Sequence, residues 1–245
     1  MANATLDGVA LVTGGARRIG AAICEALATA GATVVVHAHR STADAESLAT
    51  RLGGHVVAGD LAKPAVAEGL VQQAAAAAGA PVRYVVNNAS RFPQHRLADA
   101  TYDDLDAMMR LHAWAPLAIS RAAAGQGANA VVNLVDTRIA GHDPRHMPYL
   151  LSKQALWHLT RTLARELAPM RVNAVAPGPI LAPTAPDGAA AAPDATAELQ
   201  AAVGSTLLAR VGRPDEVAHA VRFLLENEYI TGDTVFVDGG RHARY

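Results

Sequence analysis

Seven short valine-rich runs, separated by longer stretches rich in alanine and leucine, constrain the fold of this chain more than any other feature. The runs are Val9–Val12, Thr33–Val36, His55–Val57, Arg83–Val86, Val131–Val135, Arg171–Val175 and Thr234–Val237. They are continuously apolar rather than alternating, which is typical of strands buried on both faces of a parallel sheet. Strands that alternate with helices predict a doubly wound α/β sheet that binds ligands at the carboxyl ends of its strands.

The segments between the runs carry helical periodicity. Ile19, Ile23 and Leu27 recur every four residues, and Gly31 follows as a stop signal. Further helices are predicted over Thr101–Ala124, Tyr149–Ala168 and Asp215–Leu225. With 245 residues, the chain is long enough for one well-buried α/β domain over residues 1–245.

Two segments break the alternation of strands and helices. Arg91–Ala100 follows a strand and is predicted to be a loop at the strand tips. Pro179–Thr196 holds four prolines among many alanines, and loops of this length within one domain are often lids over a substrate. Its position directly after a strand favours a substrate loop at 179–196, with an unstructured insertion as the alternative.

The overall composition argues against several classes of partner. The formal net charge is −1, so neither nucleic acid nor another polyanion is expected to bind. Cys24 is the single cysteine and is expected to be a core thiol in the first helix. The first seven residues lack the basic and apolar regions of a signal peptide, and no apolar run reaches the roughly 20 residues that span a bilayer. We expect a cytoplasmic protein that acts on a small molecule and holds no metal.

The segment Thr13–Gly20, between the first strand and the first helix, is rich in glycine. Glycines there let the backbone approach a pyrophosphate closely, while the helix N-terminus supplies free N–H groups and a positive dipole. A buried strand before this turn and an amphipathic helix after it favour nucleotide binding. The residues of the turn predicted to contact the cofactor are Gly14, Arg17, Arg18 and Ile19.

The end of the second strand indicates which nucleotide binds. Enzymes that use NAD usually place an acid there for the ribose 2′-hydroxyl, but this chain has His39, Arg40 and Ser41. A guanidinium fork and a hydroxyl suit a 2′-phosphate, so NADPH is predicted, with a solvated basic turn as the alternative. Residues after the next two strands complete the predicted cofactor site: Asp60 and Leu61 at the adenine, and Asn88, Ala89 and Ser90 beside the cofactor.

Tyr149 and Lys153 lie four residues apart in a predicted helix and therefore share a face, about 6 Å apart along its axis. The lysine is one of only two in the chain, against nineteen arginines, so its place at this spacing is informative. A nearby ammonium favours the phenolate, so we expect Lys153 to lower the pKa of Tyr149. The pair then forms a proton donor that works at neutral pH.

Together these segments resemble the short-chain dehydrogenase/reductase family over essentially the whole chain. The resemblance is carried by Thr13–Gly20, by Asn87, Asn88 and Ala89, by Tyr149 and Lys153, by Asn173 with Pro177 and Gly178, and by the tail from Tyr229 to Gly240. It implies a seven-stranded Rossmann sheet, a homotetramer, and hydride transfer with Tyr149 as the acid and Lys153 as its tuner. It also implies that Pro177, Gly178 and Ile180 lie beside the nicotinamide.

Three departures from the usual family pattern narrow the resemblance. Arg18 stands at the second glycine of the loop, Asp136 at the catalytic serine, and His112 at an asparagine that usually supports a proton-relay water. The first two departures resemble the pteridine reductases, and His112 is similar to the bacterial dihydromonapterin reductase branch of the family. A buried core histidine is the alternative interpretation of His112.

The resemblance to pteridine reductases implies reduction of a pterin ring C=N bond, in dihydromonapterin, dihydrobiopterin or dihydrofolate. It also implies that Phe92 stacks on the pterin, that Ser90 bonds to cofactor or substrate, and that Arg17 donates to the pterin edge or the cofactor phosphate. Packing within its own loop is the alternative for Phe92. Asp136 fits this chemistry, since a carboxylate would repel the oxyanion of a ketone but accepts from ring N–H groups, or helps Tyr149 pass a proton through water.

Two other functions stay open at this point. One is a short-chain reductase of another carbonyl or imine, such as a ketoacyl or sugar substrate, although Asp136 and Phe92 argue against it. The other is a catalytically silent NADP-binding sensor. The paired Tyr149 and Lys153 argue against a sensor, which has no need of a proton donor.

Overall fold

The computed structural model describes residues 6–180 and 200–244. In that part of the chain seven strands form one sheet in the order β3-β2-β1-β4-β5-β6-β7, and every neighbouring pair is parallel. The strands are β1 (Val9–Val12), β2 (Thr33–Ala38), β3 (His55–Ala58), β4 (Val82–Asn87), β5 (Ala130–Leu134), β6 (Arg171–Pro177) and β7 (Thr234–Val237). The predicted Rossmann-type, doubly wound sheet is confirmed, and each predicted strand bound lies within two residues of the observed one.

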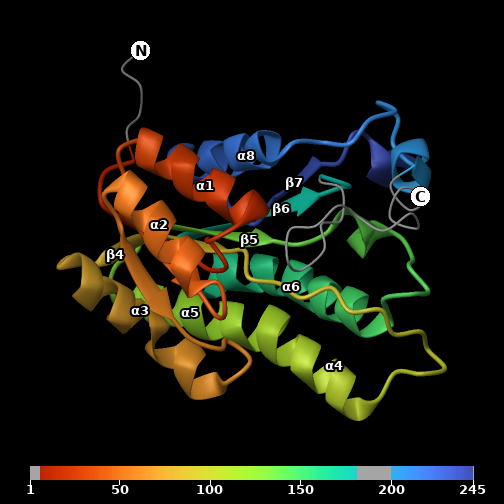
Figure 1. The fold of residues 1–245 in the computed structure, drawn as a ribbon, viewed down its shortest axis with the longest axis horizontal. Helices are drawn as coiled ribbons and strands as arrows, with labels where there is room; N and C mark the ends of the chain where they lie inside the picture. The colour runs from red at the N-terminus through yellow and green to blue at the C-terminus, as the bar shows by residue number, and fades with distance from the viewer. Residues whose placement is uncertain (1–5, 181–199, 245) are drawn as a thin grey trace.

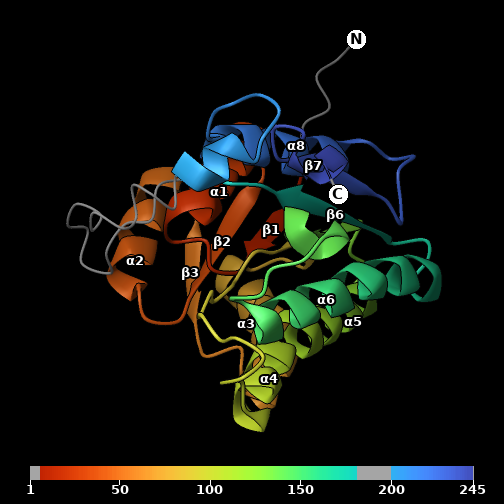
Figure 2. The same cartoon turned by 90° about the vertical axis from the view of Figure 1, so that its right-hand side faces the viewer.

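Helices cover both faces of the sheet (Figure 1). One face carries α1 (Arg18–Thr29), α2 (Thr42–Leu52) and α8 (Pro214–Glu226); the other carries α3 (Pro64–Ala78), α4 (Tyr102–Met109), α5 (Ala115–Gly125) and α6 (Met147–Glu166). Figure 2 shows the sheet between these two helical layers. Along β1, Ala10 and Val12 face the first layer while Val9 and Leu11 face the second, which explains why the strands are apolar at every position.

The predictions for the single cysteine and for the two irregular segments can be compared with the structure. Cys24 is buried in α1, as predicted for a core thiol, and burial raises its pKa to about 12. Arg91–Ala100 contains neither a helix nor an extended strand, which confirms the predicted loop. The predicted substrate loop at 179–196 lies outside the described residues, apart from Pro179 and Ile180. Over 6–180 and 200–244, no helix is both long and apolar enough to cross a membrane.

The helix predicted over Thr101–Ala124 is confirmed, since helical residues run without a gap from Tyr102 to Gly125, but one turn of it is not α-helical. A π-helical turn, η1 (Arg110–Trp114), separates α4 from α5. Pro116 lies in the first turn of α5 and has no N–H to donate to the carbonyl four residues earlier, so the regular α-helical pattern cannot run through this point. Leu111 and His112 of the turn are buried, and His112 thereby reaches the site described below.

Candidate active site

Two adjoining cavities lie at the carboxyl ends of the strands, and each residue predicted for the site lines at least one of them. The first has a volume of about 320 Å³; the predicted residues in it are Gly14, Arg17, His39, Arg40, Ser41, Asp60, Leu61, Ala89 and Ser90. The second has a volume of about 410 Å³; the predicted residues in it are Arg18, Ile19, Asn88, Ser90, Phe92, Asp136, Tyr149, Lys153, Pro177, Gly178 and Ile180. Ser90 and Arg91 line both, so one extended ligand can occupy the two cavities. The individual roles of these residues stay predictions.

The turn after β1 approaches the loop after β4 so closely that a side chain cannot fit between them. Gly14 has a φ of +60°, and a Cβ there would lie 2.9 Å from the Cα of Ala89. The Asn88 amide joins the two segments by donating to the carbonyls of Thr13 and Gly14, each at 2.9 Å. The first turn of α1 contains no acid, and Arg17 at its N-cap makes no side-chain capping bond. The N–H groups of this helix end are therefore open to an anion.

The two arginines of this turn, Arg17 and Arg18, line different cavities. Arg17 donates from Nε to Oδ2 of Asp44 on α2, at 2.6 Å, and lines only the first cavity of the two. The structure thus does not bring Arg17 together with Phe92 and Asp136, and its predicted contact with substrate stays a prediction. Arg18 lines the second cavity and has a φ of +54°, a conformation that costs a residue with a side chain about 1–2 kcal/mol. Strain at a cavity-lining residue is a sign of a functional role.

Arg40 and Ser41 follow β2 and line the first cavity. The Arg40 guanidinium makes no hydrogen bond or ion pair with any residue that the structure describes. Ser41 lies at the N-cap of α2, yet its hydroxyl makes no capping bond. Nearby, Asp60 accepts from the Ala62 N–H at 3.1 Å. An uncommitted guanidinium beside an uncommitted hydroxyl provides the donors that a phosphate needs.

Helix α6 carries Tyr149 and Lys153 into the second cavity, as their spacing predicted. The Tyr149 hydroxyl donates to Oδ2 of Asp136 at 2.8 Å, whereas Lys153 donates from Nζ to the Leu134 carbonyl at 2.7 Å. Burial raises the pKa of Tyr149 well above its ordinary value, and the Asp136 charge raises it further. The expectation of a lowered pKa is therefore wrong, because burial and the Asp136 charge outweigh any effect of Lys153. Burial also lowers the pKa of Lys153, to about 8.

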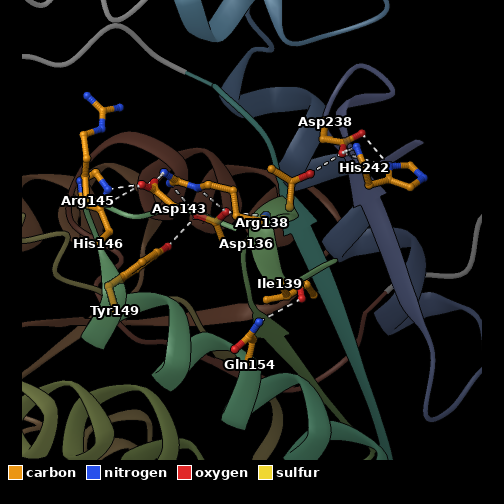
Figure 3. Close-up of polar contacts among 11 residues, drawn as sticks. Asp136, Arg138, Ile139, Asp143, Arg145, His146, Tyr149, Gln154, Asp238 and His242 are labelled. Carbon is orange, nitrogen blue, oxygen red and sulfur yellow. Dashed lines mark hydrogen bonds and ion pairs between the residues drawn. The ribbon is translucent and has the colours of Figure 1, made fainter. Parts of the chain in front are cut away.

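Asp136 has a carboxylate whose four acceptor positions are all filled (Figure 3). Oδ1 accepts from the backbone N–H of Arg138 at 2.8 Å and from its Nε at 3.0 Å. Oδ2 accepts from Nη2 of Arg138 at 3.1 Å and from the Tyr149 hydroxyl. Burial alone would raise the pKa of Asp136, but the charge and hydrogen bonds of Arg138 outweigh it, so the pKa is lowered. The carboxylate is consequently ionised at neutral pH and has no free acceptor position.

Arg138, Asp143 and His146 belong to the site although the sequence did not identify them. Asp143 contacts Nη1 of Arg138 and accepts from Nδ1 of His146 at 2.9 Å. Arg138 lies on the 3₁₀ turn η2 (Thr137–Ala140), which Asp136 caps. A buried acid at the end of a strand needs a cationic partner, so an arginine two residues later was the available signal. Asp143 and His146 reach the site through a loop, and no spacing pattern indicates them.

Phe92 lies at the mouth of the second cavity with half of its surface exposed. Its ring stacks on His146, with centroids 3.9 Å apart, and meets the edge of Tyr149 at 4.6 Å. Backbone bonds between His95 and the residues on either side of His146 hold the loop of Phe92 in place. His146 stacks on the ring and Arg138 lies over it, 4.7 Å from its centre, so these contacts favour packing within the protein, and stacking on a pterin stays a prediction.

His112 is a buried and fully hydrogen-bonded side chain. Its Nε2 contacts the Ser90 hydroxyl at 3.0 Å and accepts from the Arg91 N–H, so the proton of the neutral ring is assigned to Nδ1. Nδ1 then donates to the Ser152 hydroxyl at 2.8 Å. Burial lowers the pKa of His112 well below its ordinary value, so the ring is neutral. These contacts favour the core-histidine interpretation and place His112 behind Ser90 as its support.

The family model described as enoyl-(acyl carrier protein) reductase matches residues 14–242. The chain belongs to the short-chain dehydrogenase/reductase family. Galactitol 2-dehydrogenase of Rhizobium johnstonii is 39% identical, covering 96% of this chain and 95% of that one. Dihydromonapterin reductase of Enterobacter sp. is 30% identical, with coverages of 94% and 95%. The crystal structure of FolM alternative dihydrofolate reductase 1 from Brucella canis, complexed with NADP, is 36% identical, has a TM-score of 0.86, and covers 99% of this chain and 97% of that one.

The proteins to which this chain is similar have names that point to different substrates. A sugar alcohol dehydrogenase is more similar in sequence than a pterin reductase, while an alternative dihydrofolate reductase aligns over nearly the whole structure. Family membership therefore establishes an oxidoreductase but not its substrate. The substrate has to be argued from the side chains of the second cavity.

Proposed function

We propose that the protein is an NADPH-dependent reductase of a pterin ring C=N bond, which converts a dihydropterin such as dihydromonapterin, dihydrobiopterin or dihydrofolate to the tetrahydro form. The observation that carries the proposal is the ionised Asp136 carboxylate, hydrogen-bonded to the proton donor Tyr149 inside the second cavity. Phe92 lines that cavity with half of its surface exposed, and an aromatic side chain there can contact a flat heterocycle.

NADPH fits the first cavity and its junction with the second. The open N–H groups of α1 and the missing side chain of Gly14 suit its pyrophosphate, and Arg40 with Ser41 suits its 2′-phosphate. Lys153 and Gly178 line the second cavity, where the nicotinamide end would be held. When bound, NADPH supplies the hydride for the reaction. The NADP in the Brucella canis structure supports this choice of nucleotide.

The filled carboxylate of Asp136 discriminates between kinds of substrate. A ketone offers only an acceptor, so a Tyr149 hydroxyl that turns to it leaves Asp136 with one donor fewer. A hydrogen bond to a charged group contributes about 1.5–3 kcal/mol, and a ketone would forgo that amount. A dihydropterin carries N–H and N–H₂ donors as well as the C=N bond, so one of its donors can replace the hydroxyl at Asp136 and release it.

The release of Tyr149 leads to proton transfer. Its raised pKa keeps the hydroxyl protonated until negative charge develops on the ring nitrogen. The ring carbon then gains the hydride and the nitrogen gains the proton of Tyr149, so C=N becomes CH–NH and the tyrosinate is reprotonated from water. Tyr149 carries a negative charge after it gives up its proton and before water restores it. The positive charge of Lys153, 5.9 Å from the centre of the Tyr149 ring, stabilises the tyrosinate during that interval.

Anaerobic oxidation of NADPH with reduced pterins tests the proposal. We expect turnover with dihydromonapterin, dihydrobiopterin or dihydrofolate and formation of the matching tetrahydropterin, identified by its absorbance and mass. Simple ketones and 3-ketoacyl thioesters serve as comparison substrates. Turnover of a ketone without turnover of any dihydropterin would rule out pterin reduction.

Reduction of another carbonyl or imine is the second candidate, and the 39% identity to a galactitol dehydrogenase favours it. Sugar and ketoacyl substrates in the same assay distinguish the two. A silent sensor would bind NADPH and turn over neither class, although the proton-donor arrangement of Tyr149 then has no purpose.

The proposal includes a homotetramer, which the family resemblance implies, and a cytoplasmic location. Exposed apolar residues on α4, η1 and α6 support an assembly surface: Tyr102 is 80%, Trp114 37% and Leu151 44% exposed. Light scattering coupled to size exclusion measures the mass directly, and a monomer at micromolar concentration would contradict this part of the proposal.

A further inference from the structure

Arg138 contacts three groups at or beside the second cavity, and none of the functions assigned above requires it by itself. Its side chain is only 15% exposed. The guanidinium bonds both oxygens of Asp136, contacts Asp143, and lies 4.7 Å from the centre of the Phe92 ring. Figure 3 shows the arginine between the two carboxylates, with Tyr149 on the far side of Asp136.

The contacts of Arg138 are themselves fixed by the loop before α6. Asp143 accepts from the Arg145 backbone N–H at 3.0 Å and from Nδ1 of His146 at 2.9 Å, which orients its carboxylate toward the arginine. His146 in turn stacks on Phe92. Asp143 therefore holds the guanidinium at Nη1, while its Nε and Nη2 bond Asp136.

We propose that Arg138 is the positioning residue of this active site: it locks the Asp136 carboxylate in one orientation and leaves the Tyr149 hydroxyl as the single partner that a ligand can displace. Three of the four bonds to Asp136 come from Arg138, two from its side chain and one from its backbone. The Tyr149 hydroxyl turns about one C–O bond, whereas the guanidinium would have to leave Asp143 as well. The nature of the displacing ligand rests on the proposed function; the lock itself does not.

An arginine is required by this geometry, because its planar fork bonds both carboxylate oxygens at once. A lysine would retain the charge but contact one point, and the carboxylate could then rotate about its Cβ–Cγ bond. Charge and orientation can thus be separated by comparing Arg138→Lys with Arg138→Met.

Several charged groups face Asp136 and bear on its titration. Arg138 comes from η2, Tyr149 and Lys153 come from α6, and Asp143 with His146 comes from the loop between them. Without the arginine, burial and the Asp143 charge both disfavour ionisation of Asp136, and Lys153 is the remaining cation of this set. The pKa of Asp136 should rise when Arg138 is removed.

Carbon-13 NMR of protein labelled at the aspartate carboxyl carbon tests the lock without any substrate. The Asp136 signal is assigned from its absence in Asp136→Asn. In the unaltered protein we expect this carboxyl to stay ionised at about pH 5. In Arg138→Met its midpoint should rise by about one pH unit or more, while Arg138→Lys should stay closer to the unaltered protein. Arg96→Met, which removes an exposed arginine from the loop of Phe92, is the matched control and should leave the midpoint unchanged.

Kinetics with the substrate found for the enzyme supply the second measurement. Arg138→Lys should reduce kcat at least about tenfold without moving the acid limb of the pH profile, because the charge remains but the orientation is lost. Full activity of Arg138→Lys, or an unchanged Asp136 midpoint in a folded Arg138→Met protein, would overturn the proposal. A shifted Asp136 midpoint in Arg138→Met, together with no pterin turnover by the unaltered enzyme, would support the lock and contradict the proposed function. An unshifted midpoint in that variant, together with pterin turnover by the unaltered enzyme, would do the reverse.

Discussion

Replacing Asp136 with asparagine removes the charge at the centre of the site while keeping the size of the side chain. One carboxylate oxygen becomes an N–H₂ group, which cannot accept from Arg138 or Tyr149. Hydrogen bonds to charged groups contribute about 1.5–3 kcal/mol each, and two such bonds converge on each oxygen of Asp136. Asp143 remains as a second partner of Arg138, so the loss of stability should lie at the lower end of the range found when one partner of a buried ion pair is removed. We expect the free energy of unfolding to fall by about 3 kcal/mol at neutral pH.

The pH dependence gives this prediction a definite sign. The pKa of Asp136 is lowered in the folded protein, so its stabilisation is complete above the unfolded-state pKa of about 3.9 and is lost as the pH falls through the folded value. In urea denaturation, the difference between the unaltered protein and Asp136→Asn should be constant from about pH 5 to pH 8 and should shrink below about pH 4. A loss under about 1 kcal/mol, or a difference that does not shrink in acid, would refute the ionised, fully bonded carboxylate.

The same variant changes the titration of the proton donor. Burial is the main cause of the raised pKa of Tyr149, and the Asp136 charge is the next, so Asp136→Asn should lower that pKa. Ultraviolet difference titration follows the tyrosinate, with Tyr149→Phe identifying the signal. An unchanged Tyr149 midpoint would mean that the carboxylate does not act on the phenol.

Three further predictions follow from the contacts in the two cavities. Arg18→Gly should raise the free energy of unfolding by up to about 1 kcal/mol, since glycine adopts positive φ freely, and should weaken NADPH binding; a less stable variant would show that Arg18 is not strained. Arg40→Ala should weaken NADPH at least about tenfold while leaving NADH almost unchanged in fluorescence titrations, and equal losses would argue against a 2′-phosphate contact. Tyr149→Phe should abolish turnover and keep the Kd for NADPH, because only the hydroxyl is removed; residual steady-state activity near that of the unaltered enzyme would eliminate Tyr149 as the acid.

Much of the fold was predictable because the pattern of apolar residues along a segment reflects which of its faces are buried. Val9–Val12 is apolar at each position since both faces of the sheet are covered, and this pattern distinguishes a parallel strand from an exposed one. The π-helical turn between α4 and α5 was not predicted. Pro116 indicates that one α-helical hydrogen bond is missing, but it is equally compatible with the first turn of a new helix, so the local sequence does not show that a π turn spans Arg110–Trp114.

The site was predictable where a residue lies on a strand or helix, or directly follows a strand, as Ser90 and Phe92 do. Tyr149 and Lys153 share a helical face as their spacing requires, but the Leu134 carbonyl that receives the lysine depends on how α6 packs beside β5. The direction of the Tyr149 pKa shift was missed because its causes, burial and the Asp136 charge, depend on tertiary packing. Arg138 was missed although its place two residues after Asp136 was an available signal, whereas His146 was missed because its contacts cross a loop, where sequence distance carries no information on direction.

The most direct test of pterin reduction is the ratio of kcat/KM for a dihydropterin to kcat/KM for a ketone, measured with NADPH in the unaltered enzyme and in Asp136→Ser. Serine provides the neutral donor that ketone reduction needs and removes the acceptor that a pterin N–H would bind. A single charged hydrogen bond corresponds to about a tenfold change or more in this ratio. We predict that the ratio favours the pterin in the unaltered enzyme and falls at least about tenfold in Asp136→Ser. An unchanged ratio would contradict the role of Asp136 in selecting the substrate.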